Sequence, residues 1–227
     1  TYSVMWGNAT GSRNTALGAA ALAQNTTAND NVAIGYDAMY TNTTGTQNVA
    51  VGKDALKVNT TASYNTAVGY QTLIANTTGG ANTAVGATAL DAHTTGYHAT
   101  AVGTNSLTAN TTASNSTALG SHSLAANTTG ADNTAVGTFA LDANTTGGYQ
   151  VAIGVNALGA NNTGSYNIAI GNEALGASTG ASYNIAIGRL SLDANTSGAA
   201  NLAIGYEALG ANTTGGANVA LGFNAMF

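Results

Sequence analysis

The stretch "NTAVGYQTLIANTTGGANTAVGATAL", residues 65–90, decides the fold, because it contains the same phrase twice. The pentapeptide "NTAVG" begins at residue 65 and again at residue 82, seventeen positions later. The glycine that closes this phrase and its variants "AIG" and "ALG" occurs thirteen times, from Gly18 to Gly222, and every interval is 17 residues. A fixed period without insertions is typical of a solenoid, in which each unit packs only on its neighbours.

Numbered from the asparagine of "NTAVG", the unit predicts two short strands and two corners. Position 2 is Thr, Val, Ile or Leu, position 3 is always Ala, and position 4 is Val, Ile or Leu, which is the alternation of a strand. Position 9 is always Leu or Met, so a second strand is expected there. The glycine at position 5 and the phrase "NTTG" supply the corners. We predict an all-β parallel β-solenoid of 13 coils over residues 14–227, with two short strands per coil, as a rod about 60 Å long.

Residues 1–13 do not contain a full unit. The segment "SVMWG" at 3–7 matches "NTAVG" in outline, so these residues are expected to form a truncated first coil without its second strand. Trp6 would then cover the first complete coil as a plug, and Met226 and Phe227 would lie at an uncapped far end. Because uncovered strand edges accept further strands, we expect Trp6, Met226 and Phe227 to make end contacts with another subunit or domain.

Asparagine occupies position 1 in ten of thirteen copies and position 12 in ten of twelve. Equivalent residues lie above one another in a stack, so these amides are expected to hydrogen bond from coil to coil as ladders. The three histidines, His93, His98 and His122, replace polar residues of other copies and are interpreted as substitutions within the ladders. The corner also forms Asn-x-Thr acceptors, so a glycosylated fibre is an alternative to plain turn chemistry. These acceptors are Asn25, Asn42, Asn59, Asn76, Asn110, Asn127, Asn144 and Asn212.

The invariant alanine at position 3 gives the candidate self-association surface. Positions 2 and 4 point to one side of a strand and position 3 to the other, and a residue that faces water does not need to be a methyl group in every coil. We expect a second copy to pack there, since a thin rod of small residues gains by burying a face in a symmetric oligomer. The alternative is that the alanines line a tight interior and positions 2 and 4 face outward. The alanines are Ala16, Ala33, Ala50, Ala67, Ala84, Ala101, Ala118, Ala135, Ala152, Ala169, Ala186, Ala203 and Ala220.

Composition argues against several function classes. Four basic residues and a net charge of −5 cannot form the basic footprint that nucleic acids need, and no run of 18 apolar residues predicts a membrane span. Metal, nucleotide and hydrolase motifs are missing. Asp91, Asp142 and Asp193 share position 10 but lie three coils apart, about 14 Å, which is too far for a glycosidase pair. We expect no enzyme, no cofactor and no metal site.

Tyr149, Tyr166 and Tyr183 occupy position 17 of consecutive coils and are expected to form an aromatic stripe. The candidate roles of such a stripe are contact with glycans, contact with a neighbouring chain, or stacking on itself alone. Ice binding is a further alternative for a threonine-rich solenoid. It is disfavoured because the corner threonines, Thr26 and Thr27 in the first copy, are adjacent and cannot share one strand face.

The phrases "NVAIG" at 31–35, "NIAIG" at 167–171 and 184–188 and "NLAIG" at 201–205 resemble the Asn-Ser-Val-Ala-Ile-Gly core of the YadA-like head repeats of trimeric autotransporter adhesins. The stretch "NTAVGYQTLIANTTGGANTAVG" is similar to the 17-residue repeats of phage tail-fibre proteins and of large secreted bacterial proteins. The resemblance covers residues 14–227. It implies a left-handed parallel β-roll with three chains side by side, displayed outside the cell or on a virion.

These observations predict an extracellular structural or adhesive fibre segment on a cell surface or virion. We expect it to associate with itself as a homotrimer and to contact surface glycans or a host receptor over its outer surface, with no nucleic acid partner and no membrane insertion. The alternatives are a phage tail-fibre shaft, the subunit of a filament assembled head to tail, and an ice-binding or glycan-binding solenoid.

Overall fold

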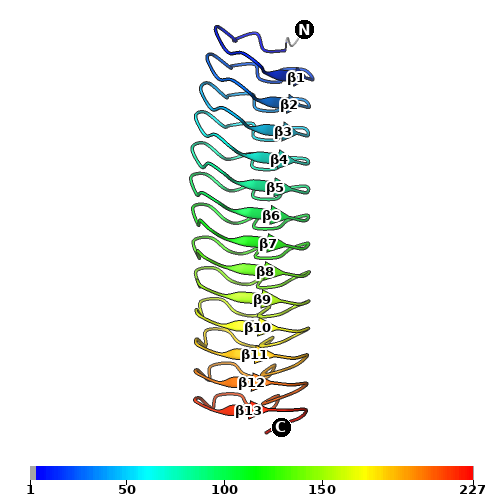
Figure 1. Ribbon diagram of the computed structural model, residues 1–227, viewed down its shortest axis with the longest axis vertical. Helices are drawn as coiled ribbons and strands as arrows, with labels where there is room; N and C mark the ends of the chain where they lie inside the picture. Colours follow the sequence, from blue (N-terminus) through cyan, green and yellow to red (C-terminus); the bar gives the residue numbers. More distant parts are fainter. Residues whose placement is uncertain (1–3, 227) are drawn as a thin grey trace. The chain divides into compact units, whose positions relative to one another are not determined.

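The computed structural model describes residues 4–226, which form strands and turns without a helix (Figure 1). They fall into two compact units, a first unit that ends at Asn115 and a second unit that begins at Ser116. The strands of the first unit are β1 (Thr15–Leu17), β2 (Val32–Ile34), β3 (Val49–Val51), β4 (Thr66–Val68), β5 (Thr83–Val85) and β6 (Thr100–Val102). Those of the second unit are β7 (Thr117–Leu119), β8 (Thr134–Val136), β9 (Val151–Ile153), β10 (Ile168–Ile170), β11 (Ile185–Ile187), β12 (Leu202–Ile204) and β13 (Val219–Leu221).

Within each unit, every strand pairs in parallel with the strand of the next coil at an interval of 17 residues. Equivalent residues therefore lie opposite one another, as Ala67 of β4 lies opposite Ala84 of β5. The strand ends are also joined between coils: the N–H of Thr66 donates to the carbonyl oxygen of Asn82 over 2.8 Å. The prediction of an all-β parallel β-solenoid with 17-residue coils is confirmed.

The glycine at position 5 follows each strand with a φ between +123° and +142°, a range that is open to glycine and strained for other residues. A Cβ placed on Gly171 would lie 2.5 Å from the carbonyl oxygen of Gly188 in the next coil. Both the backbone angle and the distance between coils therefore require glycine at this corner.

The second strand expected around position 9 is not among the strands of residues 4–226, and a run of turns takes its place. Leu73 has a φ of 50° and Gln71 a φ of 55°, so both are left-handed and not extended. The N–H of Asn76 donates to Leu73 within the coil, while the N–H of Leu73 donates to Ala89 of the next coil, each over 3.1 Å. The segment keeps its hydrogen bonds between coils but turns the chain back within one 17-residue circuit.

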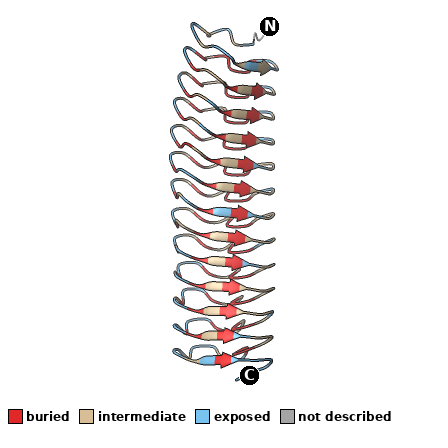
Figure 2. Ribbon diagram, viewed as in Figure 1, coloured by how far each residue is buried: buried red, intermediate tan, exposed pale blue. Residues whose placement is uncertain are grey.

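The core of each coil is narrow and consists mainly of the alanine at position 3 and the leucine at position 9. Ala67 and Leu73 have no exposed surface, and neither do most of the asparagines at positions 1 and 12. Figure 2 shows the buried middle of the strands with less buried residues beside it. Because such small residues bury little apolar area, hydrogen bonds between coils carry much of the specificity of this fold.

The match of "SVMWG" to the first strand was wrong for residues 4–7, which are in register with positions 8–11. The N–H of Met5 donates to the carbonyl oxygen of Ala21 over 3.0 Å, and Asn25 donates to the side chain of Asn8 over 2.8 Å. Residues 4–13 therefore form the second half of a coil, in which Met5 stands 17 positions before Leu22. The spacing of the two asparagines carried this signal in the sequence.

Candidate functional site

The strand side chains at positions 2 and 4, here named the sheet face, lie on the outside of each unit. Eleven of the thirteen position-3 alanines have no exposed surface, and Ala220 is 3% exposed. The prediction that these alanines contact a second copy is therefore corrected, because their methyl groups fill the interior of their own chain. The alternative orientation holds, and the position-4 residues Leu119 and Leu221 are 47% and 63% exposed.

The composition of the sheet face differs between its strands. Position 2 is threonine in β4 to β8, so each of these strands carries one hydroxyl and one aliphatic side chain. In β9 to β13 both positions are aliphatic in every strand, as in Ile168 and Ile170 of β10 or Leu202 and Ile204 of β12. No position 2 or 4 in any of the thirteen strands is charged. In the first unit, β2 and β3 are also aliphatic at both positions, so the longest run of such strands is β9 to β13 in the second unit.

The predicted tyrosine stripe is present beside β9 to β11. The ring of Tyr166 stacks on Tyr149 and on Tyr183 with centroid distances of 5.0 and 5.2 Å and interplanar angles of 1° and 2°. The three side chains remain 49–64% exposed. Because the rings cover one another's faces, the stripe presents mainly ring edges and hydroxyls, whereas sugars stack on open ring faces. Its geometry favours a ladder or a chain contact over a glycan platform.

The asparagines at positions 1 and 12 form the predicted ladders. Asn144 donates to Asn127 of the preceding coil over 2.8 Å and to the carbonyl oxygen of Gly147 in its own coil over 2.9 Å. Asn133, at position 1, donates to the same Gly147 oxygen over 2.8 Å. Two amide ladders therefore meet at the carbonyl of position 15, and they tie both sides of the coil together.

The ladder geometry contradicts the assignment of the corner asparagines as glycosylation sites. Asn25, Asn42, Asn59, Asn76, Asn110, Asn127 and Asn144 have no exposed surface, and Asn212 is only partly exposed. Glycans attach to the side-chain nitrogen, and in Asn212 this atom donates to Asn195 and to Gly215. A glycan on the folded chain has no access to these atoms without breaking the stack.

Two substitutions interrupt the position-12 ladder. At His93 the ring Nε2 pairs with the carbonyl oxygen of Gly96 over 2.9 Å, but the ring Nδ1 and the Asn76 Oδ1 of the preceding coil have no hydrogen-bond partner. The hydroxyl of Ser178 and the Oδ1 of Asn161 likewise have no hydrogen-bond partner. Unpaired buried polar atoms are costly, so these are the weak points of the ladder. His93 is confirmed as a ladder substitution, while His98 is exposed.

We expect His93→Asn to raise the free energy of unfolding by about 1–2 kcal/mol, because an amide restores the donor for Asn76 and keeps the bond to Gly96. Chemical denaturation monitored by circular dichroism measures the change. His98→Asn, at an exposed position, is the matched control and is expected to change stability by less than about 0.5 kcal/mol. A destabilised His93→Asn variant would show that the ladder does not carry this energy.

Burial lowers the pKa of His93 below its usual value, which the hydrogen bond to the Gly96 carbonyl only partly opposes. The unfolded chain then binds the proton more readily, so the stabilising contribution is present above the unfolded pKa of about 6.5 and is lost as pH falls through and below it. Between pH 7 and pH 5, we expect the free energy of unfolding to fall more steeply in the wild type than in His93→Asn. The two slopes differ by at most about 1.4 kcal/mol per pH unit. Equal pH profiles of the two melting temperatures would contradict this.

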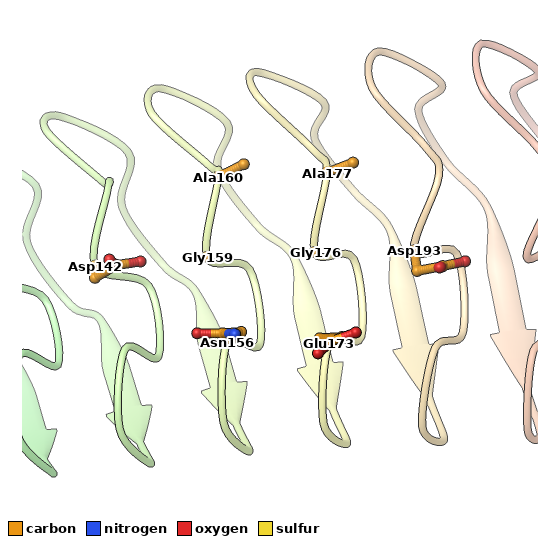
Figure 3. Close-up of a pocket in the computed structure, with 8 residues that line it drawn as sticks. All are labelled: Asp142, Asn156, Gly159, Ala160, Glu173, Gly176, Ala177 and Asp193. Carbon is orange, nitrogen blue, oxygen red and sulfur yellow. The ribbon is translucent and has the colours of Figure 1, made fainter.

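A shallow notch of about 470 Å³ lies in the second unit, where glycine occupies position 10 of two successive coils. Figure 3 shows Gly159 and Gly176 between Asp142 and Asp193, with Glu173 on one wall. Loss of solvent raises the pKa of Asp142 and of Asp193. Two whole coils lie between Asp142 and Asp193. Within residues 4–226, no group of three His, Asp or Glu side chains is placed to hold a metal ion.

Three of the four acidic residues of the first unit, Asp30, Asp37 and Asp54, form ion pairs within the chain. Lys57 bridges Asp37 over 2.8 Å and Asp54 over 3.0 Å, and the two carboxylates hold the pKa of this lysine well above its usual range. Arg13 and Asp30 form a second, exposed pair, which contributes little to stability. These charges link neighbouring coils and leave the sheet face uncharged.

Two of the three predicted end residues lie within the described part of the chain, and both are exposed. Trp6 is 62% exposed, so it does not act as a buried plug within this chain, and Met226 is 58% exposed. Phe227 lies outside the described residues. The end contacts of Trp6, Met226 and Phe227 with another subunit stay a prediction.

Comparison with known proteins found no matching family model, curated protein or solved structure. No helix within residues 4–226 is long and apolar enough to span a membrane.

Proposed function

We propose that this chain is an extracellular structural or adhesive fibre segment in which copies associate side by side, three to a bundle. The observation that carries the proposal is the uncharged sheet face, on which every strand leaves its position-4 aliphatic side chain partly or fully exposed. Soluble chains rarely leave such an ordered apolar surface uncovered unless it binds something. A left-handed coil, as the resemblance to adhesin heads implies, belongs to the same proposal.

A mechanical role suits the hydrogen bonding of the stack. Backbone amides along each coil donate to the coils on both sides, and the asparagine ladders add further hydrogen bonds between coils in the interior. A coil can open only if it breaks several of these bonds together, which favours resistance to proteases and to stretching. Adhesion to glycans or to a host receptor would use the remaining outer surface, where residue identity varies from coil to coil.

A catalytic role has less support. The two position-10 carboxylates of the notch, Asp142 and Asp193, lie three coils apart, and the best paired charges, those of Lys57, Asp37 and Asp54, serve to link coils. We therefore propose a protein that acts through its shape and surface and not through bond chemistry.

The mass of the chain in solution tests the lateral association. Light scattering coupled to size exclusion is expected to give three times the chain mass of 22.2 kDa at high concentration and smaller species on dilution. A single chain mass at every concentration would remove the lateral part of the proposal.

A further inference from the structure

The geometry points to the sheet face of β9 to β13, together with the tyrosine stripe on one side and the position-6 side chains on the other, as the surface on which a second copy of this chain docks. We name it the β9–β13 patch. This inference rests on the proposed fibre function and deepens it, because it assigns the contact to one part of the second unit and not to the whole sheet face.

The first observation is that the patch is mainly apolar, with Asn172 and Arg189 as the polar residues in its position-6 column. Its centre consists of ten aliphatic side chains at positions 2 and 4. The tyrosine stripe precedes the strands on one side, and at position 6, on the other side, Val155 is 47% and Phe223 74% exposed. Aromatic and aliphatic residues at the centre of a surface, with few charges, are the composition of interface cores.

The second observation concerns charge. Among the described side chains of the patch, Arg189 is the one with a formal charge. Its guanidinium lies 5.6 Å from the ring centroid of Tyr206 and donates to the hydroxyl of that residue over 3.3 Å. The arginine therefore lies along the rim on an aromatic ring, where it does not oppose the approach of an identical surface.

The third observation is the size of the patch. Five strands about 4.8 Å apart and seven residues of about 3.3 Å across cover roughly 500 Å² in projection. A standard stable interface buries about 800 Å² per partner, and weaker ones are smaller. The patch is thus large enough for a specific but reversible contact, and we expect association that depends on protein concentration.

The occupant that fits is a second copy. The rows of the patch repeat at the coil spacing, so a partner with the same spacing can place its side chains between them along several strands at once. A second copy offers this spacing and an equally apolar, nearly uncharged face. The threonine-bearing face of β4 to β8 has the spacing but offers a hydroxyl in each strand, which must lose its water when it is buried.

Sedimentation velocity of the full chain tests the assignment, over a concentration range from about 10 µM to 1 mM. The double variant Ile168→Lys and Ile185→Lys places two ammonium groups at the centre of the patch. The matched control, Thr83→Lys and Thr100→Lys, places them at the same position 2 of β5 and β6. Lysine is well tolerated on exposed strands, and circular dichroism verifies the fold of both. If the lysines impair folding, a second patch variant, Ile168→Thr and Ile185→Thr, is measured in their place.

We expect the wild type and the threonine-site control to associate alike, and the patch variants to raise the dissociation constant by at least about tenfold, because buried charge or hydroxyl replaces apolar contact. Association of the patch variants equal to that of the wild type would overturn the β9–β13 assignment and leave the fibre proposal standing. Loss of association in the Thr83→Lys and Thr100→Lys control alone would also overturn the β9–β13 assignment and leave the fibre proposal standing. A wild type that stays monomeric throughout would overturn both.

Discussion

Gly171→Ala is expected to lower the free energy of unfolding by about 3–5 kcal/mol. Gly171 has a φ of 140°, where other residues are strained by about 1–3 kcal/mol. The added Cβ would also lie 2.5 Å from the oxygen and 2.6 Å from the carbon of the Gly188 carbonyl. Rigid backbone cannot move aside without separating two coils, so overpacking adds further to the strain.

Gly176→Ala is the matched control, five residues away in the same coil. Its φ is not in the left-handed range, and the nearest atom to its added Cβ, the carbonyl oxygen of Glu173, lies at 3.2 Å. Alanine occurs at the equivalent position 10 in Ala23 and Ala125. We expect a change within about 0.5 kcal/mol in denaturant unfolding. Equal effects of the two substitutions would contradict the role assigned to the position-5 glycine.

Asn144→Ala is expected to cost about 3–4 kcal/mol. The amide donates to Asn127 and Gly147, and its Oδ1 accepts a bond from Gln150 over 3.2 Å. Truncation removes the partner of the Asn127 Oδ1 and of the Gln150 amide, at about 1–3 kcal/mol for each one that water does not reach, while the Gly147 oxygen keeps its bond from Asn133. The cost exceeds that of an ordinary surface substitution because the site has no exposed surface.

The control for this prediction is Asn162→Ala, which removes the same side chain at the exposed position 13. Its expected effect is below about 0.5 kcal/mol. Urea unfolding of both variants, monitored by circular dichroism, measures the difference. If Asn144→Ala were as mild as the control, the ladder would be a consequence of stacking and not a source of stability.

The fold was largely predictable from the sequence because a period without insertions leaves few alternatives to stacking. The 17-residue spacing predicted the register of every described strand pair, such as Ala67 opposite Ala84. The asparagine ladders followed from the same spacing. The turn around position 9 could not be predicted, because an invariant leucine does not indicate the left-handed backbone that Leu73 adopts.

The orientation of the strand was the main misinterpretation. Alternation places position 3 opposite positions 2 and 4, but it does not say which side is inside. The interior of a 17-residue coil has room for an alanine beside a leucine, so the small side chain is buried and the larger Ile or Val is left outside, as Ala203 and Ile204 show. The size of the residue thus reports the space available inside the coil, whereas hydrophobicity alone predicts the opposite arrangement.

The same reasoning explains the glycosylation sites and the N-terminal segment. An Asn-x-Thr sequence is a glycosylation acceptor only where the asparagine is exposed, and Asn144 is buried within the ladder. At the N-terminus the phrase "MWG" resembles the end of a strand, but the ladder partner of Asn25, Asn8, fixes the register. Hydrogen-bonding residues at a fixed spacing were a better guide than apolar ones.

Thiol labelling of a single cysteine tests the central claim, an outward apolar sheet face that a second copy covers. The chain contains no cysteine, so Ile204→Cys on the sheet face and Ala203→Cys beside it each carry one reactive group. Ile204 is 39% exposed and Ala203 has no exposed surface. Ile204→Cys is predicted to react rapidly in dilute solution and at least about tenfold more slowly at about 1 mM, while Ala203→Cys is protected at both concentrations. A reaction rate of Ile204→Cys that does not change with concentration, or a reactive Ala203→Cys in the folded chain, would contradict it.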